Sequence, residues 1–177
     1  MSSGTGIPLP REGLRILRRS WTVLVGTVSA RSRPFLTPIY YVWCGDEVFI
    51  TTGPGSWTGR NITANPHATL VFGDERGGPA APRMRVTGPA RCVDGWMPPR
   101  ALVRLALRYY LAPRALLDQL RHLRQIPLRQ RYYAAYRDGM GYIVVRPTTV
   151  EMLDAGHGRD GFAGAVLTAL DSFRGRD

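Results

Sequence analysis

Lysine is absent from this chain, in which all 24 basic residues are arginine, against 13 acidic residues. This absence excludes a lysine Schiff base and a lysine nucleophile. Cysteine occurs only at Cys44 and Cys92, too few for a disulfide framework or a cysteine zinc site. The histidines, His67, His122 and His157, lack metal-ligand spacing, and no Ser/His/Asp set or carboxylate pair is evident. We therefore expect no metal site, and the composition suits a protein whose chemistry is supplied by an organic cofactor.

Long apolar runs are also absent. No run approaches the length of a membrane span, and the first residues, MSSGTGIPLPREGLRIL, lack the basic and then apolar pattern of a secretion signal. We expect a cytoplasmic protein with no membrane association. A length of 177 residues, 44% of them hydrophobic, is sufficient for a single domain with one core.

The positive charge is unevenly distributed along the chain. Of the formal net charge of +11, residues 98–138 supply +7, since they contain nine arginines and two acidic residues. Such a charge favours anionic partners, whether a phosphorylated cofactor, nucleic acid or an acidic protein. Because the chain has no helix-turn-helix, zinc or RNA-binding signature, we do not expect nucleic acid to be the partner.

One stretch combines a strand, a turn and a capped helix. Glu47–Thr52 has the β-branched and aromatic content of a strand, and a GPG turn follows it. Ser56 is predicted to cap a short helix over Trp57–Ala64, which an Asn-Pro pair ends. A helix N-terminus offers N–H groups and a positive dipole end to an anion, and Arg60 adds charged donors. A capped helix with a solvent-facing arginine explains the pattern equally well, so both interpretations stay open.

The overall pattern predicts a mainly β protein with helices (α+β). Few helices separate the strands, which favours a closed, mostly antiparallel barrel over a parallel α/β sheet. The expected strands are Trp21–Ala30, Pro34–Trp43, Glu47–Thr52, His67–Phe72, Arg83–Asp94 and Tyr142–Asp154, and the expected helices outside residues 98–138 are Arg11–Arg19, Trp57–Ala64 and Phe162–Phe173. Residues 73–82 are predicted to form a hairpin loop.

Residues 98–138 are predicted to form a helical insertion before the last strand. On its first helix, arginine recurs every fourth residue and apolar residues fall on another side; these residues are Arg100, Arg104 and Arg108, and Leu102, Leu105 and Tyr109. Three interpretations stay open. The insertion is a cover with solvated arginine stripes, a lid over a substrate pocket, or a docking face for an acidic carrier protein.

Three sequence blocks, taken in order, resemble a known family. The blocks are RPFLTPIYYVW, FITTGPGSWTGRNITANPHATLVF and MRVTGPARCVD. They resemble the pyridoxamine 5′-phosphate oxidase-like split-barrel superfamily, and within it the flavin and deazaflavin oxidoreductases, over about residues 11–94 and more weakly over 141–153. The resemblance implies one six-stranded split-barrel domain over residues 1–177. It also implies a homodimer that holds a redox ring between its subunits.

The same resemblance implies a cofactor and the residues that bind it. The protein would transfer a hydride between a small organic substrate and either the deazaflavin coenzyme F-420 or FMN. Coenzyme F-420 is preferred because the TTGPGS, RN and NP pattern is closest to that subgroup. The implied cofactor-binding residues are Thr37, Pro38, Thr51, Thr52, Ser56, Thr58, Arg60 and Asn61.

The chain departs from the family pattern at one position. Where the family's GSRKxRN run has its lysine, this chain has Thr58, next to Trp57. Loss of one charged phosphate ligand costs about 1.5–3 kcal/mol, the value of a hydrogen bond to a charged group. The alternative function is therefore a split barrel without cofactor, acting as a non-redox enzyme or a partner-docking protein.

Overall fold

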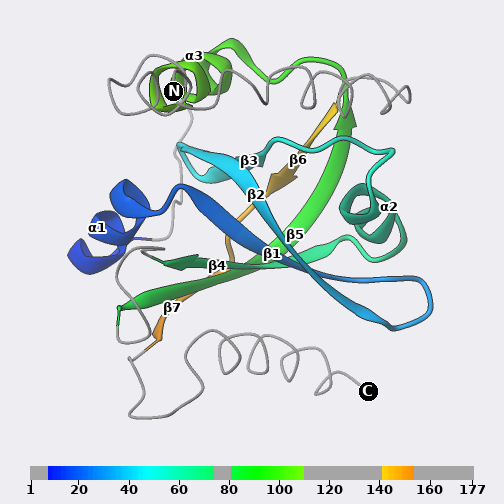
Figure 1. Ribbon diagram of the computed structural model, residues 1–177, viewed down its shortest axis with the longest axis horizontal. Coiled ribbons are helices and arrows are strands. Elements are labelled where there is room, and N and C mark those ends of the chain that lie inside the picture. The colour runs from blue at the N-terminus through cyan, green and yellow to red at the C-terminus, as the bar shows by residue number, and fades with distance from the viewer. Residues whose placement is uncertain (1–7, 74–80, 110–140, 154–177) are drawn as a thin grey trace, which may run out of the picture.

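The computed structural model describes residues 8–73, 81–109 and 141–153 (Figure 1). Its elements are α1 (Arg11–Arg19), β1 (Thr22–Val28), β2 (Pro34–Cys44), β3 (Glu47–Ile50), α2 (Trp57–Ala64), β4 (His67–Gly73), β5 (Arg83–Asp94), α3 (Pro99–Tyr109), β6 (Gly141–Val145) and β7 (Thr149–Leu153). Most of the predicted hairpin loop, most of the predicted insertion and the predicted helix at Phe162–Phe173 lie outside the described residues.

Strands β1 to β6 form a closed barrel in which every strand pair is antiparallel (Figure 1). β1 lies between β4 and β2, and β3 lies between β2 and β6. β5 then pairs with β6 and also with β4, which closes the sheet on itself. The prediction of a mainly β, antiparallel barrel with helices is therefore confirmed.

The last predicted strand, Tyr142–Asp154, is divided into β6 and β7. Both strands run along the same edge of β5, but the register slips by one residue across residues 146–148. Pro147 lies in this break and has no N–H to donate to the ladder. The Arg146 carbonyl crosses β5 at Gly88, where an added Cβ would lie 1.9 Å from the carbonyl oxygen. Only glycine allows the two backbones to approach so closely at this crossing.

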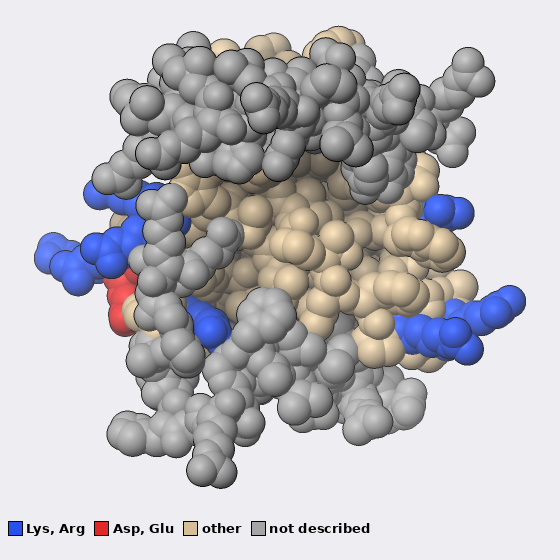
Figure 2. Space-filling model, in the orientation of Figure 1, with Lys and Arg blue, Asp and Glu red and all other residues tan. Residues whose placement is uncertain are grey.

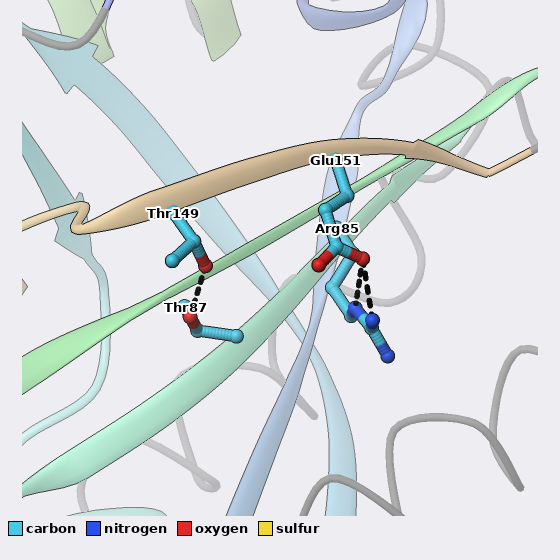
Figure 3. A network of polar contacts seen from close by, with 4 residues as sticks. All are labelled: Arg85, Thr87, Thr149 and Glu151. Carbon is cyan, nitrogen blue, oxygen red and sulfur yellow. Dashed lines mark hydrogen bonds and ion pairs between the residues drawn. The ribbon is translucent and has the colours of Figure 1, made fainter.

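Polar side chains also join β7 to β5 (Figure 3). Glu151 Oε2 accepts a hydrogen bond of 3.1 Å from Arg85 Nε and a second from Nη2 of the same side chain. The hydroxyls of Thr87 and Thr149 are hydrogen-bonded to each other. Because the Glu151 side chain is 53% exposed, solvent screens the ion pair, and its contribution is about 0–1 kcal/mol. β7 is thus held less by this ion pair than by its backbone ladder and by Val150 and Met152, which pack against the main core.

The barrel interior contains the main hydrophobic core. Alternating residues of the strands point inward, and α1 adds Ile16 and Leu17. Buried side chains of this core include Val23, Val25, Tyr41, Ile50, Leu70, Phe72, Met84, Val86 and Ile143. Full burial of one aliphatic or aromatic side chain of this kind contributes about 1.5–3 kcal/mol, so this core accounts for the stability of the barrel.

Helix α3 covers the outer face of β2, β3 and β6 and builds a second core there (Figure 1). This second core contains Val42, Cys44, Phe49, Met97, Ala101, Tyr109, Tyr142 and Val144. The Tyr109 hydroxyl lies 2.7 Å from the Trp21 carbonyl oxygen and 2.9 Å from that of Tyr41. Burial is the main cause that raises the pKa of Tyr109 to about 12.

Arg108 of α3 is bound to the barrel rather than to solvent. Its Nη2 donates to the carbonyl oxygen of Leu17 (2.8 Å), to that of Ser20, and to the Tyr41 hydroxyl (3.2 Å). The two carbonyl groups lie at the C-terminal end of α1, where a cation also interacts favourably with the helix dipole. The interpretation of a solvated arginine stripe is therefore wrong for Arg108.

The other two arginines of the stripe contact β2 and β3. Arg104 Nη1 donates to the Trp43 carbonyl oxygen (2.8 Å). Arg100 lies 3.7 Å from a Glu47 carboxylate oxygen, and Arg91 of β5 lies 3.8 Å from the other. The first helix of the predicted insertion is thus attached to the outer face of the barrel.

Candidate functional site

The turn between β3 and α2 is closed by hydrogen bonds of its own. The Ser56 hydroxyl accepts from the Gly59 N–H (2.9 Å) and donates to the Gly53 carbonyl oxygen (2.8 Å). The prediction that Ser56 caps the helix is confirmed. At the start of the turn, the Thr52 N–H donates to the Ile50 carbonyl oxygen (2.9 Å). These hydrogen bonds therefore fix the orientation of α2 relative to the end of β3.

The inward face of α2 is fixed to the barrel. Asn61 is 4% exposed, and its Nδ2 donates to the Thr27 hydroxyl of β1 (3.1 Å). Gly59 lies so close to the turn that an added Cβ would be 2.4 Å from the Gly53 carbonyl oxygen. The Asn61 amide thus joins α2 to β1, and its predicted contact with a cofactor stays a prediction.

The outward face of α2 carries an aromatic and cationic stack. Trp57 is 64% exposed, and its ring lies parallel to that of Phe35 from β2, with centroids 6.4 Å apart and planes at 5°. The Arg60 guanidinium carbon lies 4.5 Å from the centroid of the Trp57 ring. Within residues 8–73, 81–109 and 141–153, the Arg60 guanidinium has no hydrogen-bond or ion-pair partner. Its donors are therefore available to a ligand.

The predicted cofactor-binding residues on β2 and β3 differ in how they are placed relative to the turn and α2. Thr51 donates from its N–H (3.0 Å) and its hydroxyl (3.2 Å) to the Tyr40 carbonyl oxygen, which joins β3 to β2 directly before the turn. Thr37 and Pro38 are neighbours on β2, so their side chains point to opposite faces. Thr37 shares the face of Phe35, which contacts α2, whereas Pro38 shares the face of Tyr40. Of these two residues, only Thr37 therefore lies on the face of β2 whose Phe35 contacts α2.

The N–H donors at the start of α2 make the N-terminus of this helix suitable for binding an anion. The Trp57 and Thr58 N–H groups are the first two of the helix, and neither donates to another described residue. Together with the positive end of the helix dipole and the Arg60 guanidinium, they suit a phosphate group. The Thr58 side chain is 4% exposed and adds no charge. Figure 2 shows one face of the molecule, whose described residues are mostly uncharged in the middle, with basic groups at both sides and an acidic group at one side.

Other kinds of site find little support in the described ranges. No group of three or more His, Cys, Asp or Glu side chains in them is placed to hold a metal ion. Burial and the nearby Asp94 carboxylate raise the pKa of Cys92, which disfavours its reactive thiolate. None of the helices described has both the length and the apolar character that crossing a membrane requires.

A family comparison agrees with this architecture. The sequence profile of the pyridoxamine 5′-phosphate oxidase family matches residues 9–112, which include β1 to β5, α2 and α3. The chain belongs to the pyridoxamine 5′-phosphate oxidase family. The resemblance inferred from the three sequence blocks is thereby confirmed. No curated protein matches the sequence.

Solved structures share the fold of this family member at low sequence identity. HutZ, the heme storage protein from Vibrio cholerae, is 14% identical, with a TM-score of 0.58 over 84% of this chain and 95% of its own. An F420 reductase is 21% identical, with a TM-score of 0.53 over 82% of this chain and 98% of its own. A heme-binding protein from Mycobacterium smegmatis is 19% identical, with a TM-score of 0.50 over 86% and 57%. At these identities the similarity establishes the fold alone.

The sequence patterns did not reveal the contact between Phe35 and Trp57. The two residues are separated by the turn and most of two strands, and their stacking depends on where β2 lies relative to α2. The only signal was Trp57 itself, a large aromatic residue at an exposed helix start where the family pattern has a basic residue.

Proposed function

We propose that this protein is a cytoplasmic oxidoreductase that uses a flavin or deazaflavin, with coenzyme F-420 as the preferred cofactor and FMN as the other candidate. The observation that carries the proposal is the exposed Arg60 guanidinium in the first turn of α2, the helix whose first N–H groups, those of Trp57 and Thr58, bind no described residue. Donors of this kind, at a helix start, suit a cofactor phosphate. Membership of the family and the fold shared with an F420 reductase support the same proposal.

In this proposal, residues of the chain bind and orient the cofactor, while the ring, when bound, supplies the hydride chemistry. Arg60 and the first N–H groups of α2 hold the phosphate. The hydroxyls of Thr52, Ser56 and Thr58 supply the further polar groups of this turn. Thr51 fixes the end of β3 against β2 through the Tyr40 carbonyl, which keeps this wall of the site rigid. A small organic substrate exchanges the hydride.

We further propose a homodimer in which a second copy covers exposed apolar side chains of β2 and α2. Phe35 is 37% exposed, Tyr40 41% and Trp57 64%, and Pro38 is also exposed. Phe35 and Trp57 contact each other, whereas Pro38 and Tyr40 lie on the opposite face of β2, and exposed apolar surface is typical of interaction sites. Sedimentation velocity tests this proposal: a dimer that Pro38→Asp converts to a monomer supports it, and a monomeric native protein contradicts it.

Direct titration tests the cofactor. Purified protein is titrated with FMN, riboflavin and coenzyme F-420, and binding is followed by the absorbance and fluorescence of the ligand. Because FMN has the phosphate that riboflavin lacks, Arg60→Ala should weaken FMN binding about ten- to 150-fold, the range for one hydrogen bond to a charged group, and riboflavin binding little. Equal losses for FMN and riboflavin would place the phosphate elsewhere.

Two further arms of the titration address other functions. Hemin is included because HutZ, a heme storage protein, has the same fold. A shift of the hemin Soret band, without any response to the flavin or deazaflavin, would contradict the proposal. If no ligand binds, Thr58→Lys restores the basic residue of the family pattern at a position that is 4% exposed. FMN binding gained by this variant alone would favour the split barrel without cofactor.

A further inference from the structure

We propose that Trp57, supported by Phe35, positions the Arg60 guanidinium for the phosphate of the cofactor. Trp57 would thus be a positioning residue that acts through Arg60. This inference rests on the proposed function, because it names the device that prepares the phosphate-binding arginine of that same site.

Three observations support this role. Arg60 lies with its guanidinium carbon 4.5 Å from the centroid of the Trp57 ring, one helical turn away. Phe35 lies parallel to the same ring, at 5° and 6.4 Å, which fixes an indole that is otherwise 64% exposed. No other group of the described residues binds the Arg60 guanidinium, so within this part of the chain the indole alone orients it.

The stack leaves the arginine able to bind an anion. A guanidinium is planar, and its five N–H donors point outward in its own plane. Contact with an aromatic ring uses the face of the guanidinium and therefore does not occupy these donors. With its guanidinium carbon over the Trp57 ring, Arg60 can thus offer N–H groups to a phosphate while it stays against the indole. A hydrogen-bonded ion pair with a carboxylate would have oriented the side chain but occupied the donors.

Prior orientation matters because Thr58 brings no charge to this corner. A free arginine side chain loses rotamer freedom when it binds, and an arginine held in place beforehand loses less. The stacking energy at an exposed site corresponds to about a two- to fivefold change in affinity. Since Arg60 is the only cationic side chain on α2, this gain acts on the principal charged contact.

A double-mutant cycle tests the inference directly. FMN and riboflavin affinities are measured for the native protein and for Trp57→Ala, Arg60→Ala and the double variant, and coenzyme F-420 is measured alongside. We expect Trp57→Ala to weaken FMN and coenzyme F-420 binding about two- to fivefold and to leave riboflavin within about twofold. In the Arg60→Ala background, Trp57→Ala should change FMN affinity less than about twofold, because the group it positions is gone.

Matched variants separate positioning from general damage. Trp57→Phe keeps an aromatic face and should retain most of the FMN affinity. Trp96→Ala removes another exposed tryptophan, 71% exposed and without an aromatic or cation–π partner among the described residues. This control should leave FMN affinity unchanged, and thermal unfolding of every variant verifies that it is folded.

Each outcome decides for or against the inference. If Trp57→Ala weakens FMN and riboflavin equally, or weakens FMN equally with and without Arg60, the indole contacts the ligand itself and the inference fails. If Arg60→Ala weakens FMN but Trp57→Ala does not, the inference fails while the proposed function stands. If the native protein binds neither FMN nor coenzyme F-420, the proposed function fails, and this inference fails with it.

Discussion

Replacement of Arg108 by alanine should lower the stability of the whole barrel. The Arg108 guanidinium joins α3 to the end of α1 through the carbonyl oxygens of Leu17 and Ser20, and it contacts the Tyr41 hydroxyl and ring. In the Arg108→Ala variant these acceptors lose a charged donor, and α3 loses its link to α1. The link joins segments 91 and 88 residues apart in sequence, so nothing local replaces it.

The size of the effect follows from these contacts. One nitrogen has two hydrogens to share among three acceptors, so at most two strong bonds form at once. Each hydrogen bond to a charged group contributes about 1.5–3 kcal/mol, and the contact with the Tyr41 ring adds about 0.5–1 kcal/mol. The Tyr41 hydroxyl lies 3.2 and 3.4 Å from the same two carbonyl oxygens and compensates in part. We therefore expect a loss of about 2–4 kcal/mol, or roughly 5–15 °C in Tm for a domain of this size.

Urea denaturation and thermal unfolding, followed by tryptophan fluorescence, measure this loss. Arg104→Ala is the matched control, since it removes an arginine from the same stripe that makes one hydrogen bond to a single carbonyl oxygen, that of Trp43. Because this hydrogen bond is exposed to solvent, whereas those of Arg108 are partly buried, its expected cost is below about 1.5 kcal/mol. If Arg108→Ala is no less stable than Arg104→Ala, the assignment of Arg108 as the link between α3 and α1 is refuted.

Three further predictions concern stability. Burial raises the pKa of Tyr109 from 10.0 to about 12, so the fold favours the protonated form; its contribution is complete below pH 10 and is lost as the pH rises towards 12. The free energy of unfolding should fall between these pH values by about 2–3 kcal/mol more in the native protein than in Tyr109→Phe, as measured by urea denaturation. Gly88→Ala should cost more than about 3 kcal/mol or prevent folding, because its Cβ would overlap a backbone carbonyl, whereas Gly73→Ala meets only a side chain at 3.3 Å and should be tolerated in the same assay. Asn61→Leu should cost about 1–3 kcal/mol because the buried Thr27 hydroxyl loses its partner, and hydrogen exchange should increase in α2.

Local sequence signals were sufficient for most of the fold. The observed bounds of α1, α2 and β5 are identical to those predicted. For α2, the reason is that both ends are encoded nearby: Ser56 closes the first turn, and the Asn-Pro pair prevents the helix from continuing. The strands were likewise recognisable from their β-branched and alternating residues.

The division of the last strand could not be predicted because it depends on a distant residue. Residues 142–153 have apolar character on both sides of Pro147, and a single proline is tolerated within an edge strand. The break occurs because the Arg146 carbonyl crosses β5 at Gly88. Nothing near Pro147 in the sequence indicates which residue of another strand it will meet.

The local structure at the candidate site was predicted, whereas its tertiary contacts were not. Sequence analysis placed Ser56 and Arg60 at one helix start, and the structure confirms the cap. It could not indicate that Asn61 bonds Thr27 or that Phe35 stacks on Trp57, since both contacts join α2 to strands through the tertiary fold. A local pattern identifies which groups are present, whereas their partners follow from the topology.

The position of α3 also determines where this chain tolerates redesign. Ala101 and Tyr109 fill the second core, so excising all of residues 98–138 would leave Val42 and Val144 facing water. An engineered chain that replaces the arginine-rich segment with a short linker, or carries a reporter domain there, should therefore keep the helix through Tyr109 and begin the exchange beyond it.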